Sequence, residues 1–136
     1  MENFEAIRDH LLGAYKLTAN EPFMACVELS LENGHRHQSI FLSEMEDEDG
    51  RRYLRVSTAV GALLLLLDPR RALEFNWKSQ VGYLACTELE GTPYLHLCEN
   101  RPYAGLSAQE VDRLILEIGG LGDRIERMLS ADGDAL

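Results

Sequence analysis

Basic residues are scarce in this chain of 136 residues. Its 13 Lys and Arg stand against 23 Asp and Glu, which gives a formal net charge of −10. A surface this negative repels phosphate backbones within a Debye length, and proteins that bind DNA or RNA need a basic face. Direct nucleic-acid binding is therefore disfavoured, and the negative surface favours basic partners. Hydrophobic residues make up 46% of the chain, which is enough for one globular core.

Long apolar runs are missing as well. The most apolar stretch, residues 61–67, holds five consecutive leucines, whereas a membrane-spanning helix needs about 20 apolar residues. The first eight residues are acidic and mixed, without the basic start and apolar centre of a signal peptide. We therefore expect a cytoplasmic protein that has no membrane partner.

Cysteine is rare, and Cys26, Cys86 and Cys98 form no CxxC pair, which excludes zinc-ribbon and thioredoxin-like sites. Three cysteines cannot all pair within one chain, so we expect buried, reduced thiols. The motifs of serine hydrolases, P-loop proteins, dinucleotide-binding folds and zinc proteases are absent too. The sequence therefore predicts neither catalysis nor a cofactor. A cysteine nucleophile paired with a distant histidine is the enzymatic alternative.

The first third of the chain predicts a helix followed by a hairpin. Phe4 to Tyr15 has apolar residues at helical spacing, with Asn3 as a possible cap. Residues 23–31 alternate between apolar and polar side chains, as a half-buried strand does. Asn33-Gly34 then favours a tight turn, because both residues tolerate a positive φ. A two-residue turn there pairs Val27 with Ile40 and Ala25 with Leu42, apolar against apolar.

The remaining patterns predict a third strand over 51–60 and a helix from after Thr58 to about Trp77. Asp68-Pro69 either kinks that helix or starts a new one. Two strands follow near 81–89 and 92–99, and Ser107 with Glu110 forms a capping box before the last helix. The order α-β-β-β-α-β-β-α predicts an α+β fold, with an antiparallel sheet packed against helices. It spans a single domain, residues 1–130, with a frayed tail at 131–136.

The last two strands carry a candidate contact surface. Alternation places Leu84 and Cys86 with Leu95 and Leu97 on the face that helices cover. The opposite face then carries the tyrosines, and its residues are Tyr83, Tyr94, His96 and Cys98. Cys86 and Cys98 therefore point to opposite sides, which argues against a disulfide between them. Tyrosine-rich faces are typical of protein contacts, although the chain's own helix or loop can also cover such a face.

A second candidate site is the pair His35 and His37 beside the predicted turn. The hairpin register places both on the face that carries Glu28, Ser30 and Glu32. A His-x-His pair near a carboxylate can bind zinc or copper, and a solvated surface is the alternative. The other two histidines, His10 and His96, have no carboxylate at a spacing that would fix a base beside them.

The element order, size and acidity resemble the YbjN-like proteins of bacteria, whose fold is similar to that of class I type III secretion chaperones. The matching stretches are 53–58, 73–76, 94–99 and 104–110, and the resemblance extends over nearly the whole chain. No catalytic motif accompanies the resemblance. It implies a homodimer that binds another protein, either as a regulator or as a chaperone-like adaptor, without turning anything over.

We therefore expect a dimeric, chaperone-like protein-binding module that uses apolar and aromatic surface. The alternative is a small-ligand or metal sensor that uses the His35/His37 face. For the three leucine candidates and for Phe75, burial in the core is the competing interpretation, and Trp77 is open to both. The candidate partner-contact or dimer-contact residues are Leu64, Leu67, Leu73, Phe75, Trp77, Tyr83, Tyr94 and His96.

Overall fold

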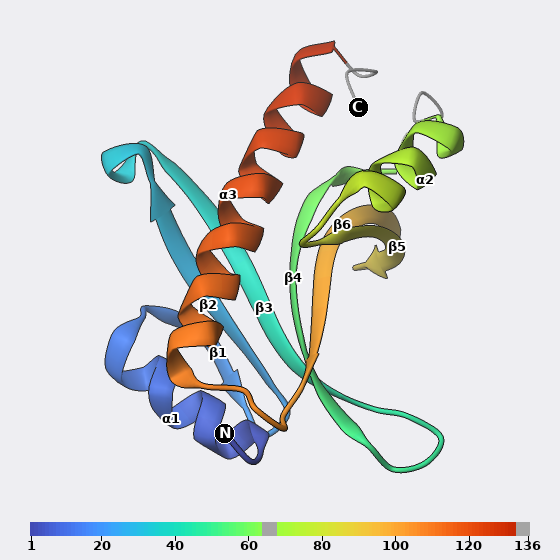
Figure 1. Ribbon diagram of the computed structural model, residues 1–136. Coiled ribbons are helices and arrows are strands. Elements are labelled where there is room, and N and C mark those ends of the chain that lie inside the picture. Colours follow the sequence, from blue (N-terminus) through green and yellow to red (C-terminus); the bar gives the residue numbers. More distant parts are fainter. Residues whose placement is uncertain (64–67, 133–136) are drawn as a thin grey trace.

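The computed structural model describes residues 1–63 and 68–132. Within these ranges the chain forms a six-stranded antiparallel sheet with the strand order β1-β2-β3-β4-β6-β5, together with three α-helices (Figure 1). In chain order the elements are α1 (Phe4–Ala14), β1 (Leu17–Glu21), β2 (Met24–Leu31), β3 (Arg36–Glu46), β4 (Arg52–Ala62), α2 (Pro69–Lys78), β5 (Tyr83–Leu89), β6 (Thr92–Pro102) and α3 (Ala108–Asp132). The predicted α+β class and antiparallel sheet are confirmed.

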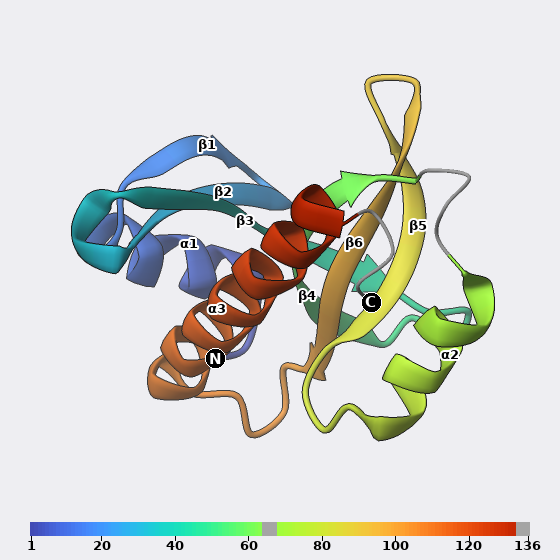
Figure 2. The ribbon, with the colours of Figure 1, turned by 90° about the horizontal axis from the view of Figure 1, so that it is seen from above.

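Both α1 and α3 pack on one face of the sheet, and α2 lies beside the edge strand β5 (Figures 1 and 2). The core between this face and the helices includes Phe4, Ile7 and Leu11 of α1. The first helix is confirmed together with its cap, since the Asn3 side chain accepts a hydrogen bond from the Ala6 amide at 3.0 Å. No helix within the described ranges is long and apolar enough to cross a membrane.

The predicted hairpin has the register that the alternation required. Val27 pairs with Ile40 and Ala25 with Leu42, so the apolar side chains of β2 and β3 share the core face. Asn33 and Gly34 form the turn with φ of 58° and 87°, values that suit asparagine and glycine. The last pair of the two strands is Leu31 with Arg36. A two-residue turn would have added one more pair, but a short 3₁₀ turn covers Glu32–Gly34 instead.

Three expectations about the elements were wrong. Strand β1 was not predicted, because it is short and its residues show no clear apolar alternation. The adjacent Phe23 was placed in a strand, but it lies in the turn between β1 and β2 and is 64% exposed. Residues 59–62, which were expected to be helical, belong to β4 instead, because this strand pairs with β6 as far as Ala62 and Tyr94.

The second helix begins at Pro69, with Asp68 as its cap. Of the two alternatives for Asp68-Pro69, a kink or the start of a helix, the second is therefore confirmed. The Asp68 carboxylate accepts a hydrogen bond from the Arg70 amide at 3.0 Å, and Pro69 occupies the first turn, where its missing N–H costs nothing. The last helix begins as predicted, with the Glu110 amide donating to Ser107 Oγ at 3.1 Å. The backbone of α3 is helical to Asp132, and residues 133–136 lie outside the described ranges.

The predicted pairing of the last two strands is confirmed, but the predicted burial of Cys86 is not. Leu84 pairs with Leu97 and Cys86 with Leu95, and Leu84, Leu95 and Leu97 are buried. Cys86 is exposed, as are the residues that follow it on the edge strand β5, whose hairpin with β6 extends away from the helices (Figure 2). The expectation that all three thiols are buried is therefore wrong. The three cysteines are free.

Candidate partner-binding surface

Helix α2 carries apolar side chains on two sides, one that packs against the core and one that is exposed. Phe75 and Ala72 pack against the core. Leu73 and Trp77, four residues apart, lie together on the other side, where they are 68% and 89% exposed. They border an open hollow of about 520 Å³ together with Arg70, Glu74 and Lys78. The interpretation of Trp77 as a core residue is therefore wrong.

The position of α2 is fixed by a polar contact to the sheet edge. The Asn76 side chain donates to the Leu84 carbonyl at 3.2 Å and accepts from the Leu84 amide at 2.7 Å. Asn76 thus occupies the place that a further strand would take beside Leu84. Because both bonds come from one side chain, the helix has a defined rotation, and that rotation keeps Leu73 and Trp77 directed away from the core.

A second hollow continues from this surface toward α3. It measures about 430 Å³ and lies between the end of α2 and the outer side of α3. Its apolar part consists of Phe75, Val81 and Leu121, and Lys78 lines both hollows. We call this second hollow the α2–α3 furrow; its residues are Phe75, Lys78, Ser79, Gln80, Val81, Glu117, Leu121 and Arg124.

The sheet face opposite α3 carries the predicted aromatic surface, but less of it is accessible than expected. Tyr83 and Tyr94 are half-buried, whereas His96 and Cys98 are 7% and 6% exposed. Both buried residues lie on β6, an interior strand with β4 on one side and β5 on the other. Leu89 of β5 shares a hollow with side chains of β3 and β4. His96 is therefore unsuited to direct partner contact.

The buried groups on this face offer no evident nucleophile. Burial lowers the pKa of His96, and within the described part of the chain its Nε2 has no hydrogen-bond partner. Burial raises the pKa of the Cys98 thiol, which disfavours the reactive thiolate.

The predicted contact residues thus form two groups rather than one surface. Leu73, Phe75 and Trp77 are on α2, and Tyr83 and Tyr94 are on the sheet face opposite α3. Leu64 and Leu67 lie outside the described residues.

His37 lies beside two of its three expected neighbours, Glu28 and Ser30. His37 Nδ1 lies 3.4 Å from Glu28 Oε1 and 3.4 Å from Ser30 Oγ, whereas His35 is in the turn. Throughout residues 1–63 and 68–132, no three His, Cys, Asp or Glu side chains are grouped so that they could hold a metal ion.

A carboxylate contact to His10 was missed. His10 Nε2 lies 2.7 Å from Asp112 Oδ1, and the Tyr15 hydroxyl donates to the same oxygen at 2.6 Å. Burial raises the pKa of Asp112, but these two hydrogen bonds outweigh it and leave the pKa below its usual value. The contact joins the end of α1 to α3, and 102 residues separate the two side chains, so local spacing gave no signal.

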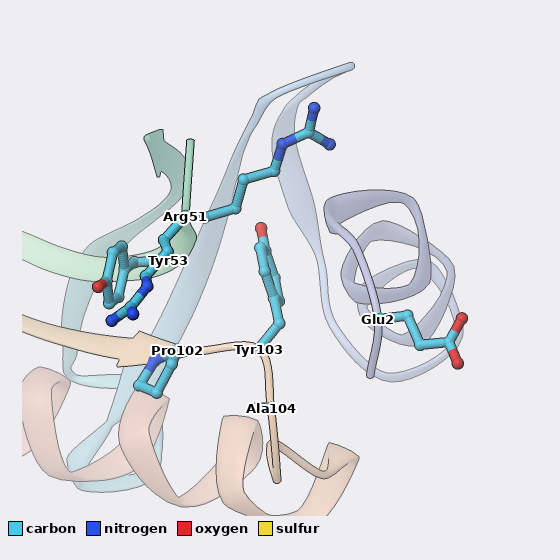
Figure 3. Close-up of a pocket in the computed structure, with 7 residues that line it drawn as sticks. Glu2, Arg51, Tyr53, Pro102, Tyr103 and Ala104 are labelled. Carbon is cyan, nitrogen blue, oxygen red and sulfur yellow. The ribbon is translucent and has the colours of Figure 1, made fainter. Parts of the chain in front are cut away.

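A further hollow of about 620 Å³ lies where β4 begins and β6 ends (Figure 3). Tyr103 stands at its centre, and the Glu2 carboxylate points away from it. The Tyr103 hydroxyl donates to Glu44 Oε1 at 3.0 Å; burial, and then this bond, raises the pKa of the tyrosine, so the hydroxyl stays protonated. The lining residues include no Ser, Cys or His, so the hollow holds none of these nucleophiles or bases. Its residues are Glu2, Arg51, Arg52, Tyr53, Pro102, Tyr103 and Ala104.

Comparison with known proteins identifies the fold. A chain of the HopA1–SchA chaperone–effector complex superposes on this one with a TM-score of 0.59. The two chains are 15% identical, and the match covers 91% of this chain and 93% of the other. No family model and no curated protein matches the sequence. The membership in the YbjN-like family therefore stays a prediction. This chain has the fold of a component of a chaperone–effector complex.

Proposed function

We propose that this protein is a non-catalytic, chaperone-like module that binds another polypeptide through α2. The observation that carries the proposal is the exposure of Leu73 and Trp77 side by side on a helix whose rotation Asn76 fixes. Large aromatic side chains that the protein's own chain leaves uncovered are typical of binding hot spots. The fold shared with a chain of a chaperone–effector complex supports the same function.

We further propose that the protein is a homodimer that associates through the sheet face carrying Tyr83 and Tyr94. These tyrosines are half-buried on strands that pair in register, and together they offer an apolar surface with polar tips. Because they face away from α3, this face leaves the furrow beside α2 free for a partner. Replacing both tyrosines with glutamate is expected to give a folded monomer in light scattering. A dimer of unchanged stability would remove this assignment.

The partner-binding role is tested by affinity capture from cell lysate with a matched pair of variants. Leu73→Glu/Trp77→Glu adds two charges to the exposed side of α2. Leu12→Glu/Leu116→Glu makes the same change at two leucines that are each 58% exposed on α1 and α3. We expect the wild type and the second variant to retain one dominant protein that the first variant loses. Equal capture by all three proteins would contradict the proposed surface.

A further inference from the structure

The α2–α3 furrow carries positive charge in a protein whose net charge is −10. Lys78 and Arg124 both line it, and no carboxylate of the described residues lies within 4 Å of either cation. The single acidic residue in the furrow, Glu117, already pairs with Arg113 at 3.1 Å. The furrow therefore has two cations available to a ligand.

The neighbouring surface of α2 has the same sign. In α2 the one acidic residue, Glu74, pairs with Arg70 at 2.9 Å, so no carboxylate of the helix balances Lys78. Exposed charges interact over about 8–10 Å at physiological salt, so the local balance, rather than the distant carboxylates, decides what is attracted here. A partner that approaches α2 from the furrow meets the positive charges of Lys78 and Arg124, although the molecule as a whole is acidic.

Apolar side chains lie between these cations. Phe75, Val81 and Leu121 are the apolar lining of the furrow, and Leu73 and Trp77 continue it across Lys78. An aromatic side chain such as Trp77 can bury about 150–250 Å² on binding, and this area drives association, whereas the cations select the partner. A ligand that matches both features has apolar residues on one side and carboxylates flanking them.

We propose that the α2–α3 furrow and the adjoining exposed side of α2 together dock an amphipathic, acidic segment of the partner polypeptide, with its apolar side on Phe75 and Leu121 of the furrow and on Trp77 beside it, and its carboxylates at Lys78 and Arg124. This inference rests on the proposed protein-binding function and specifies the chemistry of the partner. It differs from the expectation drawn from net charge alone, which favours basic partners.

Two model peptides with identical leucine positions test it, one with glutamate and the other with lysine at all remaining positions. Trp77 is the only tryptophan of the chain, so its fluorescence reports directly on the site. We expect the glutamate peptide to shift the emission of Trp77 to shorter wavelength in a saturable way and to bind at least about tenfold more tightly than the lysine peptide, since two exposed ion pairs become two repulsions in the exchange. Added salt should reduce this difference.

Matched charge reversals identify the cations responsible. Lys78→Glu/Arg124→Glu is expected to reverse the peptide preference. The control is Arg8→Glu/Arg51→Glu, which changes the net charge of the protein by the same amount. Both arginines lie outside the furrow and, like Lys78 and Arg124, form no ion pair with the described carboxylates. The control variant should therefore keep the peptide preference of the wild type. Tighter binding of the lysine peptide, or equal binding of both, would overturn the proposal.

The outcomes also separate this inference from the proposed function. If lysate capture depends on Leu73 and Trp77 while the lysine peptide binds better, protein binding stands and the acidic partner is wrong. If Trp77 emission instead shifts with protein concentration and no peptide competes, a second copy occupies the furrow and the inference fails. If neither peptide binds and no captured protein depends on α2, both proposals fail.

Discussion

Gly122 of α3 lies against Thr58 of β4, so an alanine there tests how the helix packs on the sheet. A Cβ added at this position would lie 2.4 Å from Thr58 Cγ2, well inside van der Waals contact. Thr58 is fully buried and cannot easily turn away, because its hydroxyl donates to the Ser39 carbonyl at 2.8 Å and accepts from Gln38 Nε2 at 2.8 Å. Either the helix must move or both hydrogen bonds must be disturbed.

The size of the effect follows from two opposing terms. Overpacking a buried site costs about 1–3 kcal/mol. Alanine in a helix interior is more favourable than glycine by up to about 1 kcal/mol. Gly120 on the same helix is the control, because a Cβ there meets only the flexible Arg124 side chain at 4.0 Å. The helix term is common to both positions, so Gly122→Ala is expected to be less stable than Gly120→Ala by about 1–3 kcal/mol.

Urea unfolding followed by circular dichroism measures this difference. Thr58→Ser removes the offending methyl group and keeps the hydroxyl, so in the Gly122→Ala background it should recover stability that it does not gain alone. Equal midpoints for Gly122→Ala and Gly120→Ala would refute the argument that the helix–sheet contact requires glycine.

Further predictions concern charge and ligands. Asp123 is 3% exposed and accepts hydrogen bonds from Arg36 and Arg127. Burial raises the pKa of its carboxyl group, but the hydrogen bonds to the two arginines outweigh burial, so the pKa lies below its usual value. Its stabilisation is therefore present above about pH 4 and is lost as pH falls below that, and Asp123→Asn should cost about 1.5–3 kcal/mol in urea unfolding at neutral pH and lack this acid loss. The lowered pKa of buried His96 means that the unfolded chain binds the extra proton first, so stability should fall as pH drops below about 6.5, and His96→Leu should flatten that slope. If the stability of His96→Leu falls with pH as steeply as that of the wild type, His96 is not the group responsible. Zinc or copper should not raise the thermal unfolding temperature, because the described residues group no three metal ligands around His37, and a saturable rise would restore the sensor alternative.

Local patterns determined the elements whose residues specify them at short range. Asn3 capped α1, Asn33-Gly34 formed the turn between β2 and β3, and the alternation of these two strands allowed one register. A one-residue shift would have moved every apolar side chain to the wrong face, which is why that register could be predicted. The α+β class followed from the same signals.

What the sequence could not decide depends on contacts between distant segments. Strand β4 extends through Ala62 only because β6 pairs with it, and His10 meets Asp112 only because α1 and α3 share a face. The exposure of Trp77 likewise depends on the rotation that Asn76 gives to α2, and the charge of the furrow depends on Lys78 of α2 and Arg124 of α3 lining the same hollow. The sequence by itself determined the elements, the pairing of β2 with β3 and the overall acidity. The tertiary structure decided which apolar residues stay uncovered and which charges surround them, because exposure and local potential are properties of packed neighbours rather than of residue order.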